Sequence, residues 1–130
     1  MDYALTNGYT VNWDGDVSEN GFVHSKGIAT NPVASSTGNG PIPEIKVTQE
    51  MRQKGYENFT TTDDHLMHIT GISNDQNGTK YYITKNSWGT SRNDFGGYLN
   101  MSESYVRAKT IFIMVNKNSI PPAIKTKLGL

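Results

Sequence analysis

The decisive stretch of the chain reads HLMHITGIS at residues 65–73 and KYYITK at residues 80–85. Apolar and polar residues alternate in the first segment, and both segments are rich in β-branched and aromatic residues, as in half-buried β-strands. Between them lies Asn77-Gly78, the strongest turn signal in the sequence, because these two residue types tolerate the positive φ angles of a tight hairpin turn. The stretch therefore predicts an antiparallel β-hairpin.

The alternation also assigns side chains of the first strand to two faces. One face carries Leu66, His68, Thr70 and Ile72, and the other carries His65, Met67, Ile69 and Gly71. His65 and His68 are three positions apart, so a strand directs their rings to opposite faces and they cannot easily share a metal ion. We therefore predict no metal site, although both histidines follow an Asp63-Asp64 pair.

Shorter elements flank the hairpin. We expect a helix end at residues 2–7, a short strand at 10–13, a helix at 49–57 capped by Thr48, a strand at 98–101, one helical turn at 102–106, and a last short helix between Ser119 and Gly129. Residues 110–116, TIFIMVN, are the most apolar run and predict a buried central strand. Residues 14–43 are rich in Gly, Ser, Asn and Pro and predict a long irregular segment. The whole indicates a single α+β unit over 1–130, with a helix- and loop-rich segment at 1–62 and an antiparallel sheet at 63–130.

Composition excludes several functional classes. The chain has 130 residues, enough for one domain, and its 12 Lys and Arg balance 12 Asp and Glu, so bulk charge indicates no nucleic-acid or membrane partner. It contains no Cys, which excludes disulfides, Cys-ligated metals and a thiol nucleophile within this sequence. No run of 18 apolar residues and no signal peptide is recognisable, and the compartment stays unassigned.

Two polar side chains fall at matching ends of the hairpin strands. His65 opens the first strand and Asn86 directly follows the second, and in an antiparallel pair those ends lie side by side. A carboxamide oxygen at this place can accept the imidazole N–H, fix the tautomer, and leave the other ring nitrogen as a general base. Trp88 would cover this hydrogen bond and keep water away. The pattern predicts two members of a Cys-His-Asn arrangement.

The same residues resemble a known family. Asp64-His65, the segment YITKNSWGT at 82–90 and GYL at 97–99 resemble the C-terminal half of papain-fold cysteine peptidases. The wider match is similar to the bleomycin hydrolase/aminopeptidase C branch, and its further segments are residues 9–18, 48–55, 63–71 and 115–128. The resemblance spans nearly the whole chain and is strongest over 63–116.

The resemblance implies a function and a division of labour. His65 would be the catalytic base, Asn86 its orienting partner and Trp88 the shielding indole, with a peptide as substrate and no cofactor. The nucleophilic Cys and an oxyanion-hole Gln belong to the N-terminal half of the fold, which has no counterpart here. A Cys-bearing half is therefore the expected partner, and we expect the isolated chain to be inactive. The branch also has a C-terminal tail in its active-site cleft and a hexameric assembly; because the sequence stops at Leu130, exopeptidase specificity and that assembly stay open.

Two alternatives remain open at this stage. The chain can be a non-catalytic half-fold that uses an exposed face for binding or assembly, or a metal-dependent hydrolase that uses His65 and His68 with Asp63 or Asp64. Half of a papain-like fold exposes the face that normally packs on the other half, and uncovered apolar area costs roughly 25 cal/mol per Å2. We therefore expect a chain that is marginally stable, or that associates with itself or with the Cys-bearing half.

Overall fold

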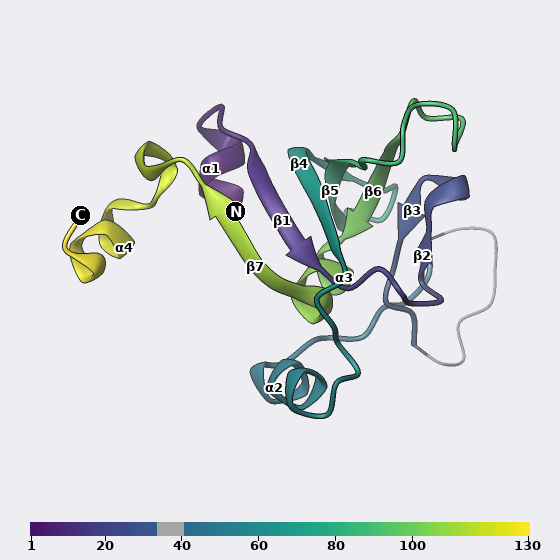
Figure 1. Ribbon diagram of the computed structural model, residues 1–130, viewed down its shortest axis with the longest axis horizontal. Coiled ribbons are helices and arrows are strands. Elements are labelled where there is room, and N and C mark those ends of the chain that lie inside the picture. The colour runs from purple at the N-terminus through teal and green to yellow at the C-terminus, as the bar shows by residue number, and fades with distance from the viewer. Residues whose placement is uncertain (34–40) are drawn as a thin grey trace.

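The computed structural model describes residues 1–33 and 41–130, which form an α+β fold on one seven-stranded sheet (Figure 1). The strands follow the spatial order β2-β3-β6-β5-β4-β1-β7. Their bounds are Val11–Gly15 (β1), Phe22–Val23 (β2), Ile28–Ala29 (β3), His65–Asn74 (β4), Lys80–Lys85 (β5), Tyr98–Ser102 (β6) and Thr110–Val115 (β7). The helices are Asp2–Thr6 (α1), Gln49–Glu57 (α2), Glu103–Lys109 (α3) and Pro122–Leu128 (α4), with short 3-10 turns at His24–Lys26 (η1) and Lys117–Ser119 (η2).

The predicted hairpin is confirmed as β4 and β5. The two strands are antiparallel, and Gly78 in the connecting turn has a φ of 81°, which favours glycine. The face assignment needs one correction, because a β-bulge between Ile69 and Gly71 inserts an extra residue into β4. Beyond the bulge the alternation is reversed, so Ile72 packs against the core like Ile69 instead of sharing the face of Leu66.

The prediction for the apolar run 110–116 is wrong in one respect. The run does form a strand, β7, but this strand lies at the edge of the sheet, and Phe112 and Met114 are 52% and 61% exposed. The more central and better buried position belongs to β1, between β4 and β7, whose Trp13 is fully buried. Hydrophobicity alone gives no information on which neighbour a strand pairs with. Here the apolar side chains of β7 form an exposed apolar surface.

The segment 14–43 is less irregular than expected. It contains β2, η1 and β3, while its residues 34–40 lie outside the described part of the chain. Strand β3 pairs parallel with β6, an exception in a sheet whose other strand pairs are antiparallel. This small sheet extension brings η1 beside the loop that follows β5, and so contributes to the site described below.

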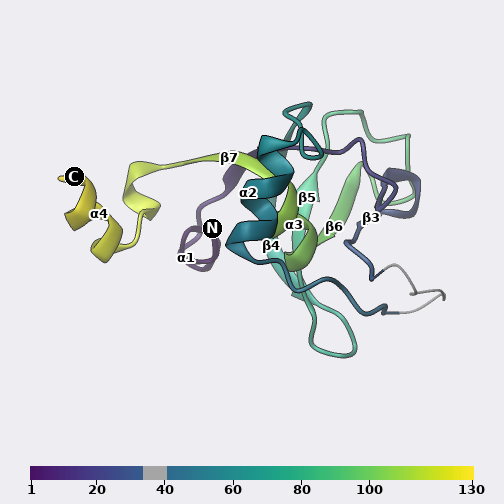
Figure 2. The ribbon, with the colours of Figure 1, turned by 90° about the horizontal axis from the view of Figure 1, so that it is seen from below.

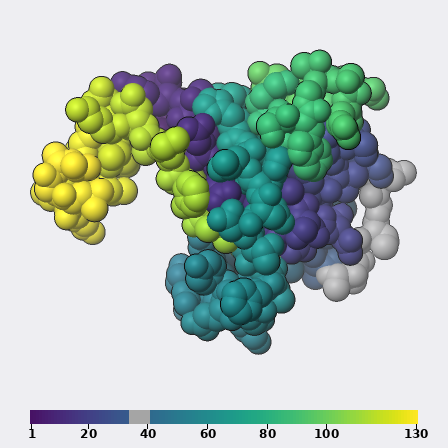
Figure 3. Space-filling model, in the orientation of Figure 1, coloured from purple at the N-terminus to yellow at the C-terminus, as the bar shows by residue number. Residues whose placement is uncertain are grey.

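The hydrophobic core lies between the sheet and the helices α1 and α3. Figure 2 shows α2 and α3 side by side, with α3 next to the strands. Predicted caps are confirmed: Thr48 Oγ1 accepts a hydrogen bond from the Met51 N–H at 3.2 Å, and Gly129 ends α4 in the left-handed conformation. Helix α4 has no buried residue and stands apart from the body in Figure 3. The fully or nearly fully buried core side chains are Ala4, Val11, Trp13, Ala29, Met67, Ile69, Tyr82, Leu99, Met101, Tyr105 and Val106.

Candidate active site

His65 and Asn86 are in direct contact, as the hairpin predicted. The His65 Nε2 atom lies 2.7 Å from Asn86 Oδ1. His65 is the first residue of β4, and Asn86 follows the last residue of β5, where its backbone N–H donates to the Gly97 carbonyl at 3.0 Å. Asn86 is 2% exposed, so water has little access to compete for its carboxamide.

One backbone group fixes the orientation of this pair. The Ser87 N–H lies 2.7 Å from Asn86 Oδ1, and because a backbone N–H can only donate, the atom it faces must be the carboxamide oxygen. The same oxygen faces His65 Nε2, which must therefore carry a proton and donate it. In the neutral ring the remaining nitrogen, Nδ1, then holds the lone pair that a general base needs.

Trp88 covers the pair from one side. Its ring centroid lies 5.0 Å from that of His65 at an interplanar angle of 44°, and 5.8 Å from that of Phe22 in an edge-on arrangement. Trp88 is itself 41% exposed, so it forms an outer cover over the buried carboxamide. Gly97, which holds the Asn86 backbone, has a φ of 80°, and a Cβ atom there would overlap the Gly89 carbonyl. The loop after β5 therefore requires glycine where it closes on the site.

His65 lines a hollow of about 490 Å3 at the end of the sheet where β4 begins. The other residues that line it are Asp14, Asp63, Asp64, Leu66, Ser87 and Phe112. Burial raises the pKa of Asp14, and the neighbouring carboxylate of Asp63 raises it further. The Asp64 carboxylate accepts a hydrogen bond from the Val17 N–H at 2.9 Å, which fixes the segment before His65. The hollow combines a base, acidic groups and exposed apolar side chains.

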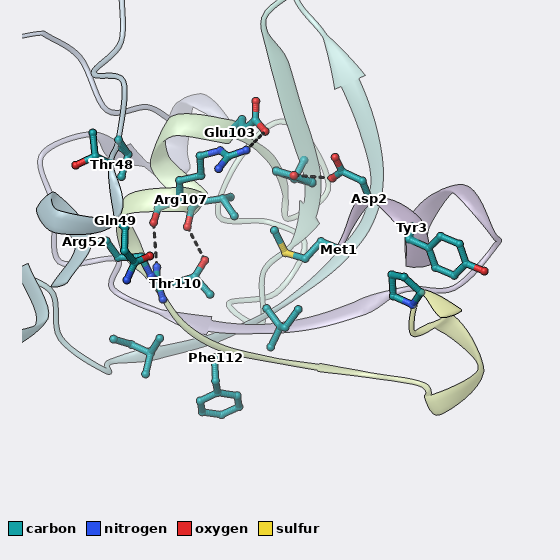
Figure 4. Close-up of a pocket in the computed structure, with 16 residues that line it drawn as sticks. Met1, Asp2, Tyr3, Thr48, Gln49, Arg52, Glu103, Arg107, Thr110 and Phe112 are labelled. Carbon is teal, nitrogen blue, oxygen red and sulfur yellow. Dashed lines mark hydrogen bonds and ion pairs between the residues drawn. The ribbon is translucent and has the colours of Figure 1, made fainter. Parts of the chain in front are cut away.

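A larger groove of about 660 Å3 lies elsewhere, between α1, α2, α3 and β7 (Figure 4). Its charged side chains are all engaged in hydrogen bonds or ion pairs, and Lys80 pairs with both Asp2 and Glu103. Arg52 donates to the Arg107 carbonyl at 2.9 Å, and Arg107 donates to Glu103 at 3.0 Å. Its described lining residues include no histidine, whereas His65 lines the smaller hollow.

The three histidines have different surroundings. The His68 Nδ1 atom lies 2.6 Å from Asn12 Oδ1 on β1, away from Asn86, which agrees with a structural role. Among the described residues no group of three His, Cys, Asp or Glu side chains is placed to hold a metal ion. His24, the third histidine of the sequence, lies beside the pair: its Nδ1 atom is 3.3 Å from Asn86 Nδ2.

The sequence contained no signal for the position of His24. The residue lies 62 positions from Asn86 and reaches it through the two-residue strands β2 and β3. Such short strands have no readable period, because alternation needs at least four residues to be recognised.

Comparisons with known proteins identify the family of the chain. The profile of the Peptidase C1-like family matches residues 6–129, which is nearly the whole chain. The chain belongs to the Peptidase C1-like family. This membership agrees with the resemblance to papain-fold cysteine peptidases carried by the NSWG segment and His65.

Individual relatives extend the comparison. Fruit bromelain from Ananas comosus is 45% identical over 42 residues, which are 32% of this chain and 12% of that protein. The solved structure of PepW from Lactobacillus rhamnosis HN001 superposes with a TM-score of 0.68 at 16% identity, over 98% of this chain and 28% of that chain. The bromelain protease from Ananas comosus in complex with the E64 inhibitor gives a TM-score of 0.44 at 16% identity, over 82% of this chain and 40% of that one. The chain thus spans under a third of the length of PepW. At this level of identity, the superposition shows that the two proteins share a fold.

Among the described residues no helix is long and apolar enough to span a bilayer.

Proposed function

We propose that this chain supplies the general base of a cysteine peptidase, with His65 as the base, Asn86 as the residue that orients it and Trp88 as its cover. The single observation that carries the proposal is the hydrogen bond from His65 Nε2 to a buried Asn86 Oδ1, whose orientation the Ser87 N–H fixes. This arrangement leaves Nδ1 of His65 as the basic nitrogen. The nucleophilic Cys is contributed by another polypeptide segment, since the sequence has none.

The proposed reaction is acyl transfer through a thioester. His65 Nδ1 takes the proton of the thiol, and the thiolate sulfur attacks the peptide carbonyl carbon. The carbon–nitrogen bond then breaks, and His65 returns the proton to the leaving amine. Water, deprotonated by the same nitrogen, then attacks the thioester carbon; the carbon–sulfur bond breaks, the acid is released, and His65 returns the proton to the thiolate. Asn86 stabilises the imidazolium that forms in both halves of the cycle, because its carbonyl oxygen faces the N–H that stays protonated throughout.

We assign the activity to an aminopeptidase of the bleomycin hydrolase/aminopeptidase C type. The support is the sequence similarity of residues 9–18, 48–55, 63–71 and 115–128 to that branch. Fluorogenic aminoacyl amides should be cleaved, while the same amides with an acetylated α-amine should be poor substrates. Equal cleavage of both would instead indicate an endopeptidase.

The test is reconstitution of activity. The chain is mixed or co-expressed with a Cys-bearing N-terminal segment of the same family, and hydrolysis of aminoacyl amides is followed with and without iodoacetamide. We expect activity that iodoacetamide abolishes and EDTA leaves unchanged, and that falls at least about 100-fold in His65→Gln, the usual contribution of a general base. The matched control is His68→Gln, on the same strand and also bonded to an asparagine, which should keep full activity. Activity that survives His65→Gln would refute the assignment of the base.

A second candidate function has one observation in its favour. Strand β7 presents Phe112, Ile113 and Met114 to solvent at an open sheet edge, as an assembly module would. Formation of a stable complex with the Cys-bearing segment, without any thiol-dependent hydrolysis, would support this non-catalytic role.

A further inference from the structure

We propose that His24 is a positioning residue for the His65–Asn86 pair, held as the neutral Nε2–H tautomer so that its Nδ1 accepts a hydrogen bond from Asn86. The inference rests on the proposed function, because positioning matters only if His65 acts as a base. It extends that function by a third side chain, which neither the sequence pattern nor the family comparison assigns.

The Ser87 N–H fixes the orientation of the Asn86 carboxamide. The Ser87 N–H can only donate, so the atom 2.7 Å away is Asn86 Oδ1, and the Asn86 NH2 group must point the other way. There it meets His24 Nδ1 at 3.3 Å. Two donors cannot face each other without repulsion, so Nδ1 of His24 carries no proton and accepts. In a neutral ring the proton then resides on Nε2.

The other ring nitrogen of His24, Nε2, gains no hydrogen bond from this tautomer, so the tautomer is explained by the hydrogen bond to Asn86. His24 is 7% exposed, and its Nε2 atom is buried without a hydrogen-bond partner among the described residues. An unpaired buried N–H is rare in folded proteins and needs an explanation. The network supplies one, because the alternative tautomer would direct a second donor at the Asn86 NH2 group.

Two hydrogen bonds hold the backbone of His24 in place, and Trp88 packs against its ring. Its carbonyl accepts hydrogen bonds from Gly27 N–H at 2.9 Å and from Asn93 Nδ2 at 3.1 Å. The ring packs edge-on against Trp88, with centroids 5.1 Å apart, so one indole covers both histidines. His24, Asn86 and His65 thus form one chain of hydrogen bonds under Trp88.

The surroundings of His24 favour its neutral form. Burial lowers the pKa of the imidazole, and the positive charges of His65, Arg92 and Lys85 lower it further. Protonation would place an N–H on Nδ1 against the Asn86 NH2 group. The carboxamide could then avoid repulsion only by turning, which would break its bonds to both His65 and Ser87.

The test uses nuclear magnetic resonance on the full 130-residue chain and needs no activity. The sequence has only three histidines, so His24, His65 and His68 variants assign every imidazole signal in a two-bond proton–nitrogen correlation spectrum. We expect His24 as the neutral Nε2–H tautomer, titrating at lower pH than in the urea-unfolded chain. A signal from the Nδ1–H tautomer would overturn the inference.

Two substitutions separate hydrogen bonding from packing. His24→Leu removes the acceptor, and the Nε2–H of His65 should exchange with solvent about two- to fivefold faster, as expected for loss of one long neutral hydrogen bond next to it. His24→Asn retains an acceptor near the Nδ1 position and should restore slow exchange. His68→Leu, the matched control, should leave the His65 signal unchanged.

The outcomes are distinguishable from those of the reconstitution experiment. Unchanged exchange in a folded His24→Leu, or equal exchange in His24→Leu and His24→Asn, would overturn the inference even if reconstitution gives an active peptidase. If His24→Leu does not fold, the tautomer in the unmodified chain and the exchange rate in His24→Asn still decide the question. Failure of reconstitution with the expected spectra would refute the peptidase assignment and leave the hydrogen-bond chain intact.

Discussion

Removal of the Asn86 carboxamide tests the hydrogen-bond network of the site directly. Asn86→Ala deletes three side-chain hydrogen bonds, to His65, His24 and the Ser87 N–H, at a residue that is 2% exposed. A typical intramolecular hydrogen bond contributes about 1 kcal/mol net, so we expect a loss of about 3 kcal/mol in the free energy of unfolding. Natural domains have only about 5–15 kcal/mol in total, so the effect is large.

The assay is urea unfolding followed by circular dichroism, with trimethylamine N-oxide in all samples if the unmodified chain is too unstable to show a folded baseline. The matched control is Asn12→Ala, which removes one hydrogen bond, to His68, at a less buried residue and should cost about 1 kcal/mol or less. A loss at Asn86 no larger than that at Asn12 would refute the idea that the carboxamide is held by a three-bond network. It would also remove the structural basis for the assigned tautomer of His65.

Three further predictions concern the edge strand, an acid-sensitive carboxylate and a glycine. Phe112→Lys should weaken self-association, measured by analytical ultracentrifugation, and leave the free energy of unfolding of the monomer within about 0.5 kcal/mol, since the side chain is 52% exposed. Burial acts to raise the pKa of Asp16, but hydrogen bonds from Thr62 and Ser18 and the charge of Lys109 outweigh it, so the pKa is lowered. The folded chain should therefore lose stability below about pH 4, and Asp16→Asn should flatten this loss in urea unfolding at pH 6 to 3. Gly15→Ala should cost at least about 2 kcal/mol, because a Cβ atom would overlap the Lys109 carbonyl and the Trp13 indole; a stable Gly15→Ala chain in thermal unfolding would contradict this packing.

The hairpin and the pair at its open end were predictable from the sequence because both depend on local signals. Asn77-Gly78 and the flanking apolar patterns determine which strands pair and roughly in what register. Once β4 and β5 are antiparallel, His65 and Asn86 lie at the same end of the hairpin, and their side chains are in contact there. The bulge after Ile69 was not predictable, since nothing in that strand distinguishes an extra residue from continued alternation.

Features that depend on long-range pairing were missed. The apolar run of β7 predicted a central strand, but its place at the edge follows from which strands lie beside β1, and that is a property of the whole sheet. The position of His24 depends on the pairing of Ile28 and Ala29 with β6, a two-residue contact 72 positions apart in the chain. Local propensity carries no information on such pairings.

The hydrogen bonds of Asn86 explain how the proposed half of an active site can be ordered without a nucleophile. The side chain bonds to His65, His24 and Ser87, and its backbone N–H bonds to Gly97, so every partner belongs to this chain. In the proposed enzyme the base is therefore oriented before a thiol arrives, and assembly with a Cys-bearing segment would need to order only that segment and the interface. A preorganised base lowers the entropic cost of forming the complete site, because the side chains that position the imidazole lose no further freedom on association. The apolar residues at the rim of the hollow, Leu66 and Phe112, then supply area to be buried in that association, while the polar network beneath them stays unchanged.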